Sequence, residues 1–157
     1  MTKSTSLLIV FFCLAVAIIA TLTYFLPHVC CRLEPDQVKP GTEIPLTSER
    51  GETIFLDGLS ASGKISSPLT IHGRARGTWF FEASFPVMLV DWDGRIIAQA
   101  PAQAQGEWMT EDFVPFKATL EFNKPAYKNN GALILKKDNP SGLPEYDDAV
   151  EAPVVFE

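Results

Sequence analysis

Residues 68–76 read Pro-Leu-Thr-Ile-His-Gly-Arg-Ala-Arg, and residues 116–122 read Phe-Lys-Ala-Thr-Leu-Glu-Phe. In both stretches small or apolar side chains alternate with polar ones, and residues 81–89 (Phe-Glu-Ala-Ser-Phe-Pro-Val-Met-Leu) continue the pattern with an apolar or small residue at every odd position. Successive side chains of a strand point to opposite faces of a sheet, so a period of two is typical of strands with one buried face. The segment from Pro68 to Phe122 therefore predicts a β-sheet domain.

Turn signals divide the surrounding sequence into further short strands. Asp93-Gly94 is the strongest hairpin signal, and Asn130-Gly131 and residues 138–142 (Asp-Asn-Pro-Ser-Gly) mark two more turns. We predict an all-β fold of about seven strands within residues 52–157 and no helix in this part, a number and spacing that fit an immunoglobulin-like β-sandwich. Pro86 cannot donate a ladder hydrogen bond, which predicts an edge position or a bulge for its strand.

An uncharged apolar stretch precedes this domain. Residues 7–26 carry no charged side chain and, at about 1.5 Å per residue, span about 30 Å as a helix, the thickness of a bilayer core. A cleaved signal sequence is the alternative, but the stretch is longer than a signal-peptide core and its Ala-x-Ala at residues 15–17 falls in the middle. We therefore expect an uncleaved transmembrane helix.

This interpretation sets the organisation of the chain. Lys3 favours an N-terminus on the cytoplasmic side, with residues 1–6 inside, residues 7–26 in the cytoplasmic membrane, residues 27–51 as a linker and residues 52–157 as the folded domain outside the cytoplasm. The chain has a formal net charge of -6 and no basic patch. A nucleic-acid partner is therefore not expected, because phosphate recognition calls for clustered Lys and Arg.

Cys30 and Cys31 directly follow the apolar stretch. Adjacent cysteines rarely bridge each other, because a disulfide needs Cα atoms several Å apart. They are either two juxtamembrane thiols or the site of an intermolecular disulfide between two chains in an oxidising compartment. A metal site with His28 is rejected, because a fourth ligand is missing and the spacing matches no standard zinc pattern.

Three tryptophans are the candidate binding surface. Trp79, Trp92 and Trp108 stand at predicted strand ends or in loops, where rigid aromatic side chains can bind peptide or glycan. The alternative is that they cap the hydrophobic core, which is the commoner fate of large aromatic residues.

We expect no catalytic, cofactor or metal site. Asp91-x-Asp93-Gly94 resembles the start of a calcium loop, but the twelfth position is Ala102 rather than Glu. His72 is the only histidine after the linker, and no Gly-x-Ser-x-Gly nucleophile elbow exists. An acidic cluster near the C-terminus is typical of a solvated loop, with a weak calcium site as the minority interpretation; its members are Glu145, Asp147, Asp148 and Glu151.

Four stretches resemble a known family. They are residues 67–75 (Ser-Pro-Leu-Thr-Ile-His-Gly-Arg-Ala), residues 79–85 (Trp-Phe-Phe-Glu-Ala-Ser-Phe), Trp-Met-Thr at residues 108–110 with Pro-Phe at 115–116, and Asn-Pro-Ser-Gly at 139–142. In this order they resemble the immunoglobulin-like domain of bacterial spore-germination proteins, the second GerM-associated domain. The resemblance implies a secreted or membrane-tethered β-sandwich that serves as an accessory or interaction module and has no catalytic residues.

The sequence therefore predicts a non-enzymatic, membrane-anchored module for binding or scaffolding at the bacterial cell envelope, with a link to spore germination implied by the resemblance. Its expected partners are the membrane, through residues 7–26, and an envelope protein or glycan that the sequence does not identify. Two alternatives remain open. One is an envelope hydrolase acting on cell-wall glycan, which lacks a supporting motif, and the other is a structural subunit cross-linked through Cys30 and Cys31.

Overall fold

The computed structural model describes residues 43–59 and 63–157. Within these residues the protein is all-β, with nine strands, two short 3₁₀ turns and no α-helix. The 3₁₀ turns are η1 (Gly77–Trp79) and η2 (Pro144–Tyr146). The strands are β1 (Ile44–Thr47), β2 (Thr53–Asp57), β3 (Lys64–Ile65), β4 (Leu69–Arg76), β5 (Ser84–Asp91), β6 (Ile96–Ala104), β7 (Phe113–Leu120), β8 (Asn130–Lys136) and β9 (Ala149–Phe156).

The predicted membrane segment, residues 7–26, lies outside the described residues, as do Cys30 and Cys31. Of the helical turns in the described part of the chain, none is long and apolar enough to cross a membrane.

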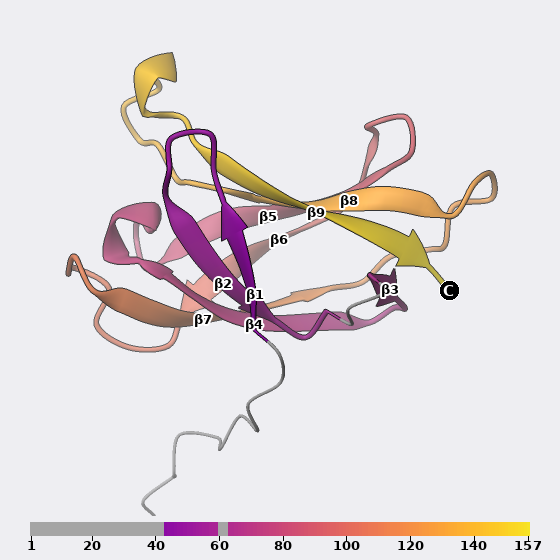
Figure 1. Cartoon of the computed structure of the whole chain (residues 1–157), viewed down its shortest axis with the longest axis horizontal. Coiled ribbons are helices and arrows are strands. Elements are labelled where there is room, and N and C mark those ends of the chain that lie inside the picture. The colour runs from indigo at the N-terminus through magenta and orange to yellow at the C-terminus, as the bar shows by residue number, and fades with distance from the viewer. Residues whose placement is uncertain (1–42, 60–62) are drawn as a thin grey trace, which may run out of the picture. The chain divides into compact units, whose positions relative to one another are not determined.

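The nine strands form one sheet in the order β1-β2-β4-β7-β6-β5-β8-β9-β3. The sheet curls so that β2, β4 and β7 make one layer and β5, β8 and β9 the other (Figure 1). Neighbouring strands are antiparallel except for β3 and β9, which are parallel. Strand β6 joins the layers, because it pairs along β5 while only Gln103 and Ala104 pair with β7.

The core lies between the two layers and follows the alternation in the sequence. In β7 every second side chain is buried, and β4 presents Leu69, Ile71 and Ala75 to the same core. Phe85 of β5 lies at the centre of an aromatic cluster, with ring centroids 5.1 Å from Phe80 and 5.0 Å from Phe116. Each such apolar side chain stabilises the fold by about 1.5–3 kcal/mol when fully buried.

Two strands are additional to the seven that the sequence predicts. Strand β1 lies within residues 27–51, where the sequence analysis expects a linker, and β3 is only two residues long. The β1–β2 hairpin is joined to the opposite layer by a buried hydrogen bond, in which Ser48 Oγ donates to Asp148 Oδ2 over 2.7 Å. The folded region consequently begins before residue 52.

Pro86 does not place its strand at an edge. Strand β5 lies between β6 and β8 in the interior of the sheet, and Pro86 is directly opposite Pro101. Because neither proline has an N–H, this is a non-hydrogen-bonded pair, and no hydrogen bond between β5 and β6 is missing there. A register shift follows between Leu89 and Val90. Of the two alternatives the edge position is therefore wrong, and a bulge-type irregularity does occur in the strand, further along than Pro86.

Candidate functional site

Trp79 belongs to the core. It ends η1, its side chain is 0% exposed, and its ring meets Phe85 edge-on with centroids 6.1 Å apart. Its indole Nε1–H donates to Glu52 Oε2 over 3.3 Å, which joins η1 to the chain just before β2. This placement fits the alternative considered for the tryptophans, that they cap the core.

Trp108 lies in the loop between β6 and β7 and is half-buried against the core. Its carbonyl oxygen accepts the Thr110 N–H over 2.8 Å. A Cβ at Gly77 would lie only 2.4 Å from the same oxygen, so this loop packs directly on η1. Trp79 and Trp108 therefore share one end of the domain.

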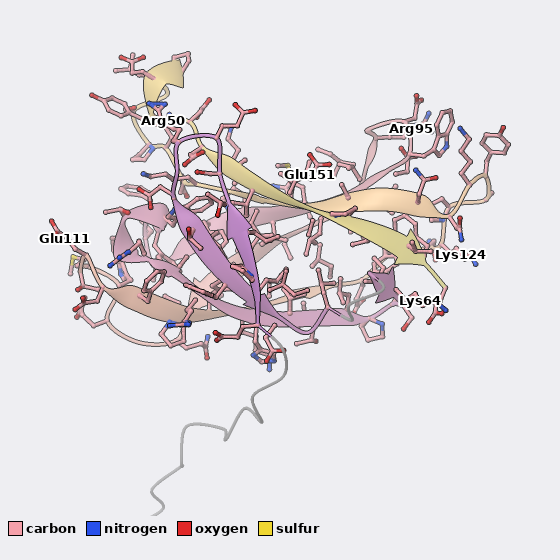
Figure 2. The ribbon with its side chains drawn as sticks, in the orientation of Figure 1. Arg50, Lys64, Arg95, Glu111, Lys124 and Glu151 are labelled. Carbon is pink, nitrogen blue, oxygen red and sulfur yellow. The ribbon has the colours of Figure 1, made fainter. Side chains whose placement is uncertain are left out.

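Trp92 lies at the other end. It is in the turn that precedes β6, whereas Trp108 is in the loop that follows β6. Figure 2 shows the two ends, with Arg95 of the turn that carries Trp92 at one and Glu111 of the β6–β7 loop at the other. The three tryptophans consequently do not form one surface, and only Trp92, at 40% exposure, presents much of its ring to solvent.

The turn that carries Trp92 is held by hydrogen bonds. Asp91 Oδ1 accepts the N–H groups of Asp93 and Arg95, each over 3.0 Å. The Gly94 N–H donates to the Asp91 carbonyl over 3.0 Å, and Gly94 has φ +74°, a conformation that glycine adopts at little cost. This confirms the hairpin predicted from Asp93-Gly94 and fixes Trp92 at the tip.

Two residues from another loop meet Trp92. The Tyr127 ring lies edge-on to the indole, with centroids 5.6 Å apart and an interplanar angle of 73°. Lys128 Nζ lies 3.9 Å from the Trp92 centroid and 5.7 Å from the Tyr127 centroid. The loops are neighbours because Asp91 pairs with Gly131 at the start of β8. We call Trp92, Tyr127 and Lys128 the aromatic end cluster.

Tyr127 and Lys128 are not among the site residues predicted from the sequence, because they lie in a stretch whose composition indicates only a polar turn. Tyr127 is 66% exposed, so the cluster is a surface feature and not an extension of the core. Lys128 has φ +57°, a backbone conformation that a residue with a side chain rarely adopts. The pairing of β5 with β8 is the only signal that brings these residues to Trp92, and it is a long-range one.

The acidic residues near the C-terminus do not form a metal site. In residues 43–59 and 63–157 no group of three or more His, Cys, Asp or Glu side chains is placed to hold a metal ion. Asp148 is buried and accepts the Ser48 hydroxyl. Asp147 accepts the Asn139 side-chain amide over 2.9 Å and lies 3.8 Å from Lys136 Nζ. These carboxylates thus have structural partners.

A hollow of about 700 Å³ lies where the β1–β2 hairpin faces β8 and β9. Arg50, Lys136 and Glu151 are among its lining residues, so its charges are mixed. Because Lys136 already lies within ion-pair distance of Asp147, this hollow offers fewer free polar groups than its lining suggests. The aromatic end cluster is the stronger candidate for recognition.

The comparisons with known proteins bear on the fold family. A family model described as the immunoglobulin-like domain of bacterial spore germination matches residues 61–142, just over half of the 157-residue chain. The matched range contains β3 to β8 and all three residues of the aromatic end cluster. No curated protein and no solved structure matches the chain.

Proposed function

Because this chain belongs to the family of the immunoglobulin-like domain of bacterial spore germination, we propose that it is a non-enzymatic binding module and that its partner contacts the aromatic end cluster. The observation that carries the proposal is the exposure of Trp92 and Tyr127 on loops that the fold holds in place. Exposed aromatic residues with restricted rotamers are the usual energetic anchors of protein interfaces.

The energetic argument rests on preorganisation. Ordering a flexible side chain at an interface costs about 0.5–1.5 kcal/mol. Trp92 is already positioned by its turn, in which Asp91 accepts two backbone N–H groups, and its ring is in contact with Tyr127 and Lys128. A partner that covers the cluster therefore gains aromatic contact area without paying the full ordering cost.

We also propose that residues 7–26 anchor the chain in the cytoplasmic membrane and that the domain works outside the cytoplasm, at the cell envelope. The uncharged length of this stretch and the position of Lys3 support the anchor. The description of the family refers to bacterial spore germination, which supports an envelope role. An envelope protein or cell-wall glycan is the proposed partner.

Capture from an envelope extract tests the binding proposal. The bait is the full-length chain in detergent, as wild type, as Trp92→Ala and as Tyr146→Ala. Tyr146 is 57% exposed in η2, outside the aromatic end cluster, and so provides a matched aromatic control. We expect one partner to be retained by wild type and Tyr146→Ala and lost by Trp92→Ala, provided that all three melt alike. A partner retained equally by all three baits would contradict this assignment.

Alkaline extraction tests the anchor separately. The full-length chain should stay in the membrane pellet, and a chain lacking residues 7–26 should be released. Release of both would refute anchoring through this stretch without bearing on the aromatic end cluster.

A further inference from the structure

We propose that Trp92 and Tyr127 form a two-walled corner that binds an organic ammonium group, and that Lys128 occupies this corner when no partner is bound. The inference rests on the proposed function and deepens it, because it names the chemical group that a partner presents to the aromatic end cluster.

The geometry of the two rings supports a cation site. The two ring planes meet at 73° with centroids 5.6 Å apart, so the rings form two walls of a corner on the surface. The Lys128 ammonium lies 3.9 Å from one centroid and 5.7 Å from the other. A cation within about 6 Å of a ring centroid is attracted to the negative face of the ring, and aromatic walls of this kind recognise quaternary ammonium ligands. One ammonium group thus meets both walls.

Lys128 is held in this position weakly. Among the described residues Lys64, Lys136 and Lys137 reach carboxylates, whereas the Lys128 ammonium lies over the two rings. An ammonium that rests on exposed aromatic faces can be displaced by an incoming cation.

The surroundings favour a cation over an anion. Asp91 and Asp93 flank Trp92 in its turn and outnumber its one cation, Arg95, which lies 3.9 Å from Asp93 Oδ2. The negative faces of the rings repel anions for the same electrostatic reason that they attract cations. In line with the proposed partner, we assign the ammonium group to a lysine side chain of an envelope protein, and a choline-type headgroup, which shares this chemistry, is the alternative outcome of the test.

An NMR titration tests the inference. The full-length chain in an uncharged maltoside detergent is titrated with tetramethylammonium chloride, with sodium chloride as the ionic-strength control, and the tryptophan indole N–H signals are followed. Trp92→Ala identifies the Trp92 signal. We expect a saturable shift of that signal in the wild type. In Lys128→Ala the apparent affinity should rise about three- to sixfold. An exposed cation–π contact of ordinary strength leaves the corner free of the Lys128 ammonium for only about one third to one sixth of the time, and the variant removes this competition.

Lys124→Ala is the matched control, because it removes one positive charge from the same loop while the structure places no ring contact on Lys124. The inference is overturned if Lys124→Ala raises the affinity as much as Lys128→Ala, or if the remaining indole signals of Trp92→Ala titrate as the wild type does. Parallel titrations with choline and with Nα-acetyl-lysine methylamide then identify the source, since the tighter ligand of the two marks the headgroup or the side chain.

The two proposals fail in distinguishable ways. If no ammonium ligand binds while Trp92→Ala still abolishes capture from the extract, the ammonium inference is overturned and the binding module stands. If tetramethylammonium binds as expected while capture does not depend on Trp92, the corner stands and the proposed contact with an envelope partner is overturned.

Discussion

Replacing Trp79 and Trp92 separately by alanine compares the same truncation in the core and in the aromatic end cluster. Trp79 is 0% exposed, and removal of a buried tryptophan side chain costs about 3–5 kcal/mol. Trp92 is 40% exposed, and its main losses are the edge contact with Tyr127 and the contact with the Lys128 ammonium. These two surface contacts together contribute about 1–2.5 kcal/mol.

Thermal unfolding followed by circular dichroism measures this difference. For a domain of about 100 residues, 1 kcal/mol corresponds to a change in Tm of about 4 °C. Trp79→Ala should therefore lower the Tm by about 12–20 °C and Trp92→Ala by about 4–10 °C. Since a small domain is stable by about 5–15 kcal/mol in total, the first variant approaches the limit of folding.

The opposite result would be a larger loss of Tm in Trp92→Ala than in Trp79→Ala, or an equal loss in both, and either would refute the assignment of Trp79 to the core and Trp92 to the surface. Equal losses would mean that the Trp92 indole packs as a core residue, and the aromatic end cluster would then be a structural feature. A loss of under about 1.5 kcal/mol for Trp79→Ala would instead show that η1 can rearrange to fill the space, contrary to the cavity argument. Trp108 is half-buried, so the loss of Tm in Trp108→Ala should lie between the losses in Trp92→Ala and Trp79→Ala.

Three further predictions concern single contacts. Ala83→Gly should raise the free energy of unfolding by up to about 1 kcal/mol in urea denaturation, because Ala83 has φ +61°, and a loss would contradict a strained turn. Ser48→Ala should cost about 1.5–3 kcal/mol in the same assay, because buried Asp148 loses its hydroxyl donor, whereas no change would mean that water replaces it. The hydrogen bond from Lys64 to Glu157, and then the Glu157 charge, raise the pKa of Lys64. The stability from this pair is present below the unfolded pKa of about 10.4 and is lost as pH rises through the folded pKa. Glu157→Gln should therefore lower the Lys64 pKa in an NMR titration and remove that alkaline dependence, and an unchanged pKa would refute the contact.

The strands with one buried face are those that the sequence predicts best. Residues 69–75 and 116–122 are predicted as strands and lie largely within β4 and β7, since a one-residue slip would turn every apolar side chain to solvent. Strand β1 was not predicted, because Pro45 reads as an interruption in a four-residue strand. Strand β3, at two residues, is too short for any periodicity.

The start of β5 shows a different limit. Residues 79–83 alternate like a strand, yet the structure has η1 and then a two-residue turn at Glu82 and Ala83, with φ +49° and +61°. Such turns normally carry Asn or Gly, so Glu-Ala gives no turn signal. The burial of Trp79 against Phe85 favours this conformation, and the local sequence gives no sign of that contact.

Of the aromatic end cluster, only the position of Trp92 could be predicted from the sequence. Asp93-Gly94 places Trp92 on a hairpin tip, where exposure follows from the turn itself. Nothing in the sequence near Tyr127 or Lys128 indicates a neighbour, because their contact with Trp92 depends on the pairing of β5 with β8. Trp79 and Trp92 look alike in sequence, but Trp79 packs against Phe85 in the core and is 0% exposed, whereas Trp92 at the hairpin tip is 40% exposed.

The sheet edges support the proposal that a partner contacts the loops of this domain and not its strands. Strand addition needs a run of outward N–H and C=O groups along an edge. Only Gln103 and Ala104 of β6 pair with β7, so the earlier part of β6 is open on that side. Pro101 faces Pro86 in a non-hydrogen-bonded pair, so its missing donor is on this open side of β6. Ser48 N–H donates to Glu52 O, and by alternation Pro45 likewise presents its missing donor to the outer side of β1. With β3 only two residues long, each described edge is short or interrupted, a common protection against unwanted pairing. Such edges disfavour the pairing of a partner strand with this sheet. The proposed binding surface is therefore the aromatic end cluster between two loops.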